Sequence, residues 1–242
     1  TTTGLGLGNS AVEALLSGLY EVIERDAAMI SWYSSFDPME LVVEDAAFET
    51  LRGRAASEGL AVTPLLLTVD VDVPVVGVAV ERETWPQIAF GTAANLDATA
   101  AARSALAEAL QNWTELRGMG PEGAAGTPGA IGAYAQTPGA AAAFADPEMA
   151  TDADAVGPET VPEGVAELDA VVERLAEAGL TPYAARTTTR DIEALGFEAV
   201  RALVPTAQPL CFGEPYFGVR ALSVPETLGV EPRTDRDHHP FP

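Results

Sequence analysis

The chain contains no lysine, one cysteine and two histidines, and each shortage excludes a kind of site. A Walker A loop needs a lysine after its second glycine, so that nucleotide-binding motif is ruled out. Cys211 alone cannot form an internal disulfide or a cysteine-rich metal site, which favours a reducing compartment, and we expect a cytoplasmic protein. His238 and His239 lie near the end of the sequence and no Gly-x-Ser-x-Gly motif is present, so a Ser-His-Asp hydrolase is unsupported.

Long apolar runs and basic segments are also missing. Without a stretch of about 18 apolar residues, or a basic start followed by an apolar run, the sequence predicts no transmembrane helix and no secretory signal. The net charge is −23, from 36 acidic residues against 13 arginines. This charge repels nucleic acid and anionic membranes, so we expect neither as a partner. An acidic chain without lysine fits a halophilic, salt-adapted cytoplasm, because salt screens self-repulsion; a genomic bias toward Ala and Arg is the alternative.

A hydrophobic content of 48% over 242 residues predicts a folded protein with a substantial core. Periodicity predicts an α/β mixed (α+β) fold in which helices pack on mixed sheets. Helices are expected at 10–29, 45–57, 97–117, 164–179 and, as a short turn, 191–195. Strand-like runs occupy 62–72, 73–81, 87–92, 181–188 and 197–204. After residue 205 we expect an extended tail.

Residues 118–163 change in composition to Ala, Gly, Pro and acids, with little periodicity. Such a sequence is typical of a flexible acidic linker or insertion, here with one short helix near 139–144. The chain is therefore expected to divide into a core at 1–117, this insertion at 118–163, and a C-terminal portion at 164–242.

The first long helix carries three acids on one stripe. At 100° per residue, Glu21 lies about 80° and Glu24 about 20° from Glu13, while the apolar side chains gather on the opposite side. Ser10 and Glu13 fit a capping box, which would explain Glu13 but not the other two. The stripe is either a solvated face or a site for a divalent metal. The preceding glycines, at positions 4, 6 and 8, miss the Rossmann spacing and are read as a turn into the helix.

Other carboxylates offer further candidates. Asp70 and Asp72 share one strand face, where two exposed acids on an antiparallel edge are favoured over a metal pair. Glu108 and Gln111 are neighbours on the flank of the second long helix, where surface pairing is the default interpretation. Mg²⁺ prefers carboxylate and amide oxygens and usually bridges substrate phosphates, so these residues and Asn9 are chemically suitable for a phosphate–metal site.

The sequence from Gly4 to Ala27 begins Gly-Leu-x-x-Gly-Asn-Ser-x-x-Glu-Ala and ends Glu-x-x-Glu-Arg-Asp-Ala. This pattern resembles the YcaO family. Residues 91–111, ending Ala-Leu-Ala-Glu-Ala-Leu-Gln, residues 186–205 and the proline-rich end are also similar to that family. Together these stretches span most of the chain outside 118–163.

The resemblance implies an ATP-dependent enzyme whose Mg²⁺ and nucleotide site is unrelated to P-loops. It would assign ATP and Mg²⁺ binding to Asn9, Glu13, Glu21, Glu24, Arg25, Glu108 and Gln111, with Glu13, Glu21, Glu24 and Glu108 as the metal ligands. Family members often carry an arginine four residues before the second helix's glutamate. Position 104 is serine here and Arg103 lies one place off, so the sequence departs from the family there.

The resemblance also implies a reaction, in which a peptide-bond oxygen is activated with ATP. In azoline-forming members a Cys, Ser or Thr side chain attacks the preceding carbonyl, the oxyanion is phosphorylated, and phosphate is eliminated. Those members end in Pro-x-Pro-x-Pro, and Pro240 and Pro242 match two of the three prolines, which implies a catalytic tail and the azoline-forming, D-protein branch. The implied partners are a ribosomally made precursor peptide and a leader-binding E1-like or ThiF-like protein, with a homodimer as one mode of assembly.

YcaO proteins have a further N-terminal region that supplies part of the nucleotide site, whereas this sequence starts without Met and almost at the motif. The resemblance therefore covers only the C-terminal portion of such a protein, and we expect a fragment. Three alternatives stay open: a non-catalytic docking or scaffold subunit or truncated remnant, a peptide thioamidating enzyme, and an acidic domain without a ligand.

Overall fold

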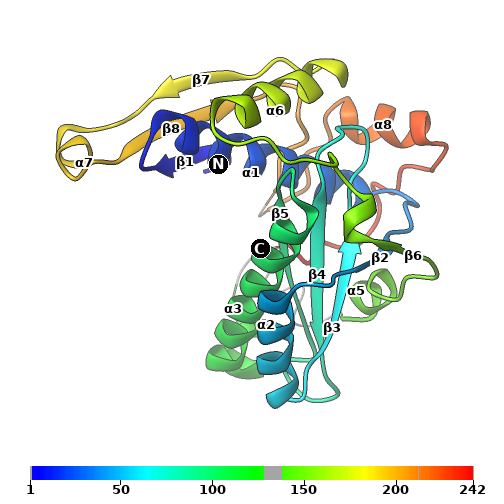
Figure 1. Ribbon diagram of the computed structural model, residues 1–242. Coiled ribbons are helices and arrows are strands. Elements are labelled where there is room, and N and C mark those ends of the chain that lie inside the picture. Colours follow the sequence, from blue (N-terminus) through cyan, green and yellow to red (C-terminus); the bar gives the residue numbers. More distant parts are fainter. Residues whose placement is uncertain (1, 128–137, 212, 242) are drawn as a thin grey trace.

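The protein is built from two β-sheets with helices between and outside them, as a computed structural model shows for residues 2–127, 138–211 and 213–241 (Figure 1). The larger sheet has the strand order β5-β4-β3-β2-β6, and the smaller one the order β1-β8-β7. Pairing is antiparallel except between β2 and β6, which run parallel. The predicted mixed α/β class is therefore confirmed.

The five-stranded sheet is buried on both faces of its central strands. Its strands are β2 Met39–Val42, β3 Ala61–Leu66, β4 Val75–Glu81, β5 Ile88–Ala94 and β6 Ala150–Asp152. Along β4, Val75 and Ala79 belong to one core, whereas Val76, Val78 and Val80 belong to the other. Continuous hydrophobicity in this strand is thus explained by helices on both sides of the sheet.

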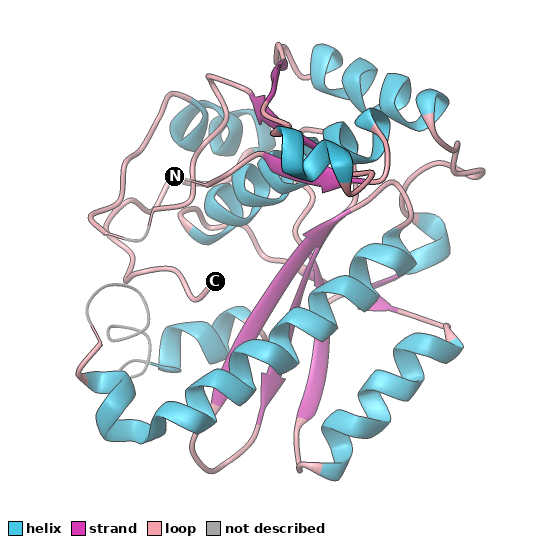
Figure 2. Ribbon diagram, turned by 90° about the vertical axis from the view of Figure 1, so that its left-hand side faces the viewer, coloured by secondary structure: helices cyan, strands magenta, loops and turns pink. Residues whose placement is uncertain are grey.

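Helices cover both faces of the larger sheet (Figure 2). On one face lie α2 Ala46–Ser57 and α3 Ala98–Ala125; α3 is kinked at Gly120, which precedes Pro121. The other face is covered by α1 Ala11–Trp32 and α5 Pro138–Phe144, together with the end of the chain. Between the two sheets, α1 occupies the centre of the molecule.

The smaller sheet packs on α1 through glycines. Its strands are β1 Leu5–Gly8, β8 Glu198–Leu203 and β7 Tyr183–Arg186. A Cβ at Gly6 would collide with the Ala14 carbonyl oxygen, and one at Gly18 would lie 2.7 Å from the Gly4 carbonyl oxygen. Strand and helix therefore touch backbone to backbone. The glycines serve this close approach, not the simple turn that the sequence suggested.

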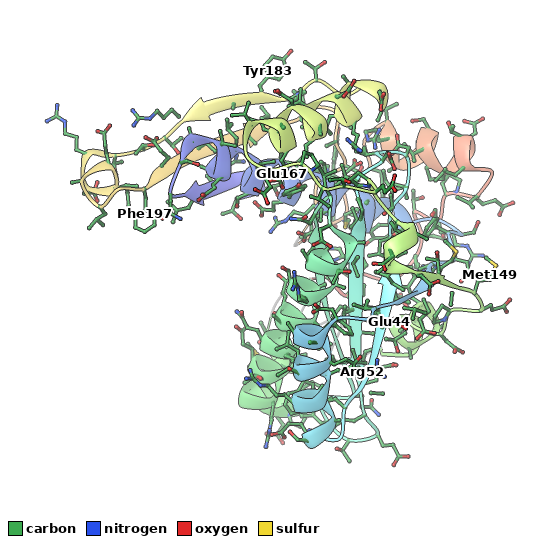
Figure 3. The ribbon with its side chains drawn as sticks, in the orientation of Figure 1. Glu44, Arg52, Met149, Glu167, Tyr183 and Phe197 are labelled. Atoms are coloured by element: carbon green, nitrogen blue, oxygen red, sulfur yellow. The ribbon has the colours of Figure 1, made fainter. Side chains whose placement is uncertain are left out.

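The C-terminal portion largely follows the predicted order of helix and strand. It contains α6 Val165–Glu177, α7 Arg190–Ala194 between β7 and β8, and α8 Arg220–Leu228. The arm formed by β7, α7 and β8 extends from the body, with Tyr183 and Phe197 on it (Figure 3). The prediction of an extended tail after residue 205 is wrong at α8. Pro225 lies inside this short helix, and an internal proline argues against a helix when only the sequence is read.

Part of the segment 118–163 is packed, unlike the flexible linker that its composition suggested. The short 3-10 helix η1 Ala153–Ala155 follows β6, and α3 continues to Ala125. The short helix predicted near 139–144 is confirmed as α5, and its Phe144 packs edge-on against Trp32 with ring centroids 5.3 Å apart. Small alanines allow this close packing without a periodic pattern. Residues 128–137 lie outside the described part, and the boundaries at 118 and 164 stay predictions.

A buried ion-pair cluster joins α1 to α8. The Arg220 guanidinium donates to both Asp26, with Nη2 to Oδ2 at 2.6 Å, and Asp70, with Nη2 to Oδ1 at 2.7 Å. The backbone N–H of Gln208 also donates to Asp26, at 2.6 Å. Burial lowers the pKa of the Arg220 guanidinium, but the hydrogen bonds and charges of the two aspartates outweigh burial and raise it. Asp70 is thus half of an ion pair, while Asp72 is largely exposed near Arg174.

None of the helices in the described ranges is both long enough and apolar enough to span a membrane.

Candidate functional site

The acidic stripe of α1 meets the N-terminal lead at Glu21. Its Oε2 accepts from the backbone N–H of Gly4 at 2.8 Å, and its Oε1 pairs with Arg25 Nη2 at 2.9 Å, one helical turn further on. Arg25 Nη1 donates to Thr3 Oγ1 at 2.8 Å. Gly4 adopts a φ of +83°, which glycine reaches without strain. The lead is thereby fixed alongside the acidic face.

About one helical turn after Glu21, α1 carries Glu24. Thr92 of β5 links this Glu24 to Glu108 of α3. The Thr92 hydroxyl donates to Glu24 Oε1 at 2.6 Å, and the Thr92 backbone N–H donates to Glu108 Oε2 at 2.7 Å. These two carboxylates come from helices on opposite faces of the sheet. They meet only because the edge strand β5 lies between them.

Both carboxylates hold their protons more tightly than usual. Burial raises the pKa of Glu24 to about 8, with the charge of Glu108 adding to the rise against the hydrogen bond from Thr92. Burial also raises the pKa of Glu108, and Glu21 contributes in the same direction. Two desolvated acids that repel each other are an electrostatically costly pair, which a bound cation would relieve.

Asn9 and Glu13 form a separate group at the start of α1. Ser10 is the N-cap, since its Oγ accepts from the Glu13 backbone N–H at 3.2 Å. The Glu13 carboxylate reaches back as predicted, but to Asn9: Oε2 accepts from the Asn9 N–H at 2.8 Å and from Asn9 Nδ2 at 3.1 Å. At a rise of about 1.5 Å per residue, Glu13 lies roughly 12 Å from Glu21 along the helix.

On α3, the other predicted residue points elsewhere. Gln111 is exposed, and its Nε2 donates to Glu115 Oε1 at 3.2 Å. Position 104, where family members often carry an arginine, is serine here. The neighbouring Arg103 instead lies 3.7 Å from Asp45, the N-cap residue of α2. Arg103 thus contacts α2 and not the Glu24–Glu108 pair.

The donor chemistry of this region fits Mg²⁺ that is shared with phosphates. Among the residues that the structure describes, no three Asp, Glu, His or Cys side chains form a group able to hold a metal ion alone. Mg²⁺ usually takes one or two carboxylates and completes its shell with water and phosphate oxygens. The desolvated pair Glu24 and Glu108, with Glu21 and Arg25 beside it, suits that arrangement, and Arg25 supplies a cation for a phosphate.

The end of the chain lies in the core beside this site. Phe241 packs edge-on against Phe90 of β5, with ring centroids 5.9 Å apart, and also contacts Trp32 and Phe144. Trp32 Nε1 donates to the Asp237 carbonyl at 2.9 Å. Pro240 is buried, and its neighbour Phe241 is the residue that contacts β5; Pro242 lies outside the described residues.

His239 fixes this tail and gives it a pH dependence. Its Nε2 lies 2.8 Å from the Cys211 carbonyl oxygen, and burial lowers its pKa from 6.5 to about 4. Because the unfolded chain accepts a proton at higher pH, this residue's contribution to stability is present above pH 6.5 and is lost as pH falls toward 4. The contribution is at most about 3 kcal/mol.

Replacing His239 by Gln should therefore flatten the dependence of stability on pH. Glutamine can still donate to the Cys211 carbonyl but cannot take up the proton. We expect urea unfolding at pH 7 and at pH 4.5 to differ less for His239→Gln than for the wild-type protein. If the free energy of unfolding falls equally in the two proteins between pH 7 and pH 4.5, His239 does not cause the pH dependence.

The sequence did not identify every residue of the site. Thr92 lies at the start of a stretch similar to the family, but no periodicity marks it as the link between two helices. Thr3 and the backbone of Gly4 were also missed, because their contacts to Arg25 and Glu21 arise from a strand that the glycine-rich lead conceals. The one clue in the sequence is Gly91, directly before Thr92, because a glycine in a strand can mark a place where another backbone packs closely against it.

The fold is a mixed α/β one in which the acidic face of α1 meets the edge strand β5 and a carboxylate of α3. A family model described as YcaO cyclodehydratase, ATP- and Mg²⁺-binding, matches residues 1–208. The chain therefore belongs to the YcaO family, and the predicted cofactors ATP and Mg²⁺ are those of the family. None of the curated proteins matches the sequence.

Solved structures show the same fold. A heterocyclase in complex with substrate and cofactor is 24% identical, with a TM-score of 0.77 over 95% of this chain and 31% of its own. The heterocyclase TruD is 23% identical, with a TM-score of 0.70 over 95% of this chain and 32% of its own. YcaO from Methanopyrus kandleri, bound with AMPPCP and Mg²⁺, is 30% identical, with a TM-score of 0.68 over 86% of this chain and 55% of its own. This chain thus spans about a third of those heterocyclases.

Proposed function

We propose that this protein takes part in the ATP-dependent activation of peptide-backbone amides, and that it converts Cys, Ser or Thr residues of a ribosomally made precursor peptide to azolines. The observation that carries the proposal is the desolvated pair Glu24 and Glu108 beside Glu21 and Arg25. Membership of the YcaO family supports it.

In this proposal Glu24 and Glu108 hold Mg²⁺, with Glu21 close by, and Arg25 contacts a phosphate. Bound Mg-ATP would supply the phosphoryl group that makes a peptide carbonyl oxygen a leaving group. Asn9 and Glu13 lie about two turns away, which places them at another part of the nucleotide. For Glu13 to bind there, its carboxylate must leave the Asn9 donors that it now accepts from.

Gln111 would join this site only after exchanging its bond to Glu115. Pro240 and Pro242 would form the reactive tail, and the burial of Phe241 against β5 would hold that tail near Thr92. A leader-binding E1-like or ThiF-like partner and a homodimeric assembly complete the proposal. A neighbouring structure of the same fold, the E. coli microcin synthetase McbBCD complex with pro-MccB17 bound, is an assembly with a bound peptide and supports a partner and a peptide substrate.

The test is product analysis. The protein is incubated with a Cys-rich precursor peptide, its leader-binding partner, ATP and Mg²⁺, and the peptide mass and ADP are measured. Azoline formation predicts the ATP-dependent loss of one water for each modified residue. In a parallel reaction with added sulfide, exchange of oxygen for sulfur would instead indicate thioamidation. If neither this chain nor a longer parent protein hydrolyses ATP, the enzyme proposal fails and the docking or scaffold subunit replaces it.

A further inference from the structure

Thr92 is buried between the two long helices. It lies on the edge strand β5 with 6% of its surface exposed. Its side chain bonds to α1 through Glu24 and its backbone bonds to α3 through Glu108. One residue therefore sets where both carboxylates sit.

The backbone half of this link is fixed by packing. A Cβ at Gly91 would collide with the backbone of Ala105 and Ala109, so β5 lies directly against α3. Asn112, one turn after Glu108, donates Nδ2 to the Phe90 carbonyl at 2.8 Å. Glu108 and Asn112 thus satisfy the outward N–H and C=O groups of an edge strand that has no further strand beside it in the described sheet.

The bond between the Thr92 side chain and Glu24 depends on the one hydrogen of the Thr92 hydroxyl. The Thr92 hydroxyl has one hydrogen to donate, and the 2.6 Å bond places it on Glu24 Oε1. Among the described residues, no donor binds Glu24 Oε2 or Glu108 Oε1. Each carboxylate is consequently held by one oxygen and can turn the other toward a shared cation.

We propose that Thr92 is a positioning residue that holds Glu24 and Glu108 at the spacing needed to bind one Mg²⁺ together. The inference rests on the proposed function, in which these two carboxylates bind Mg²⁺. Without the hydroxyl, Glu24 loses its only side-chain donor from the described residues and is free to rotate away from Glu108. Loss of such an outer-shell partner lowers metal affinity roughly 10–100-fold.

The experiment measures the Mg²⁺ concentration that the protein needs to bind a nucleotide analogue, and it does not depend on catalytic turnover. The thermal shift of the protein with AMPPCP is titrated with Mg²⁺ for the wild-type protein, Thr92→Val, Thr92→Ser and Thr92→Ala. Valine keeps the shape and the backbone N–H but removes the hydroxyl, so the midpoint Mg²⁺ concentration should rise roughly 10–100-fold. Serine restores the hydroxyl and should restore the midpoint, whereas alanine should behave as valine does.

The matched control is Thr114→Val on α3, where the hydroxyl bonds to the Leu110 carbonyl on an exposed face. This variant should keep the wild-type midpoint. A wild-type midpoint for Thr92→Val and Thr92→Ala, or the absence of rescue by Thr92→Ser, would overturn the positioning role alone. The absence of any Mg²⁺-dependent shift in the wild-type protein would overturn the proposed function, and the positioning role with it.

Discussion

Replacing Glu24 by Gln is expected to lower ATP-dependent azoline formation by at least about 100-fold, because it removes one of two carboxylates from the proposed cation site. Glutamine keeps the oxygen that accepts from Thr92, so the local geometry is preserved. A loss of this size then reports the negative charge that Glu24 would carry once Mg²⁺ displaces its proton. The measurement is the initial rate of water loss from the precursor peptide at fixed Mg-ATP.

The same Glu24→Gln variant should lose activity but gain stability relative to the wild-type protein as the pH rises. With a pKa of about 8, folded Glu24 keeps a proton that the unfolded chain loses near pH 4.5, so wild-type stability falls as pH rises through that window. Glutamine has no proton to lose. The unfolding free energy of Glu24→Gln relative to wild type should therefore increase between pH 5 and pH 9.

The control is Glu115→Gln, an exposed acid two turns after Glu108 on α3. It should retain wild-type activity and wild-type pH dependence. Full activity in Glu24→Gln would exclude this carboxylate from the reaction. An unchanged pH profile would show that Glu24 is ionised in the folded protein at neutral pH.

Replacing Arg220 by Met should be the most destabilising single change, at about 3–5 kcal/mol. Arg220 is 7% exposed and its guanidinium donates to two carboxylates, one of which belongs to Asp26, a residue that is 2% exposed. Methionine fills part of the space but leaves both acids without their cation. Urea unfolding at pH 7 measures the loss.

The matched control is Arg186→Met, since Arg186 also bridges two acids, Glu193 and Glu198, but on the exposed arm. Solvent screens that cluster, so we expect little change. A loss for Arg220→Met that is no larger than the loss for Arg186→Met would contradict a stabilising role for the buried cluster. Replacing Asp70, which is partly exposed, should cost less than replacing Asp26.

Sequence alone predicts the local features of this protein well. The helix α1 starts at its predicted cap, Ser10, and the second long helix starts after Asp97, whose Oδ1 accepts from Thr99 and Ala100. These features depend on residues within one turn of one another. The two long β strands, β4 and β5, are also found because buried strands are rich in Val and other apolar residues.

What escaped prediction depends on distant parts of the chain. The pairing of Glu24 with Glu108 needs Thr92, and Arg220 reaches Asp26 across 194 residues. The strand β1 is short and glycine-rich, so propensity opposes it; its pairing with the distant strand β8 and its close fit against α1 make it a strand. Tertiary contacts decided these elements, and a single sequence does not display them.

The cluster around Asp26 bears on how the chain reaches its fold during synthesis. Its partners Gln208 and Arg220, and the tail groups that bond to Trp32, emerge from the ribosome long after α1 itself, because about 180 to 205 residues separate them. Asp26 of the central helix α1 therefore stays without these partners until Gln208 and Arg220 have been synthesised. Such non-local closure slows folding and leaves apolar surface exposed meanwhile, so nascent chains of this protein are expected to depend on chaperones.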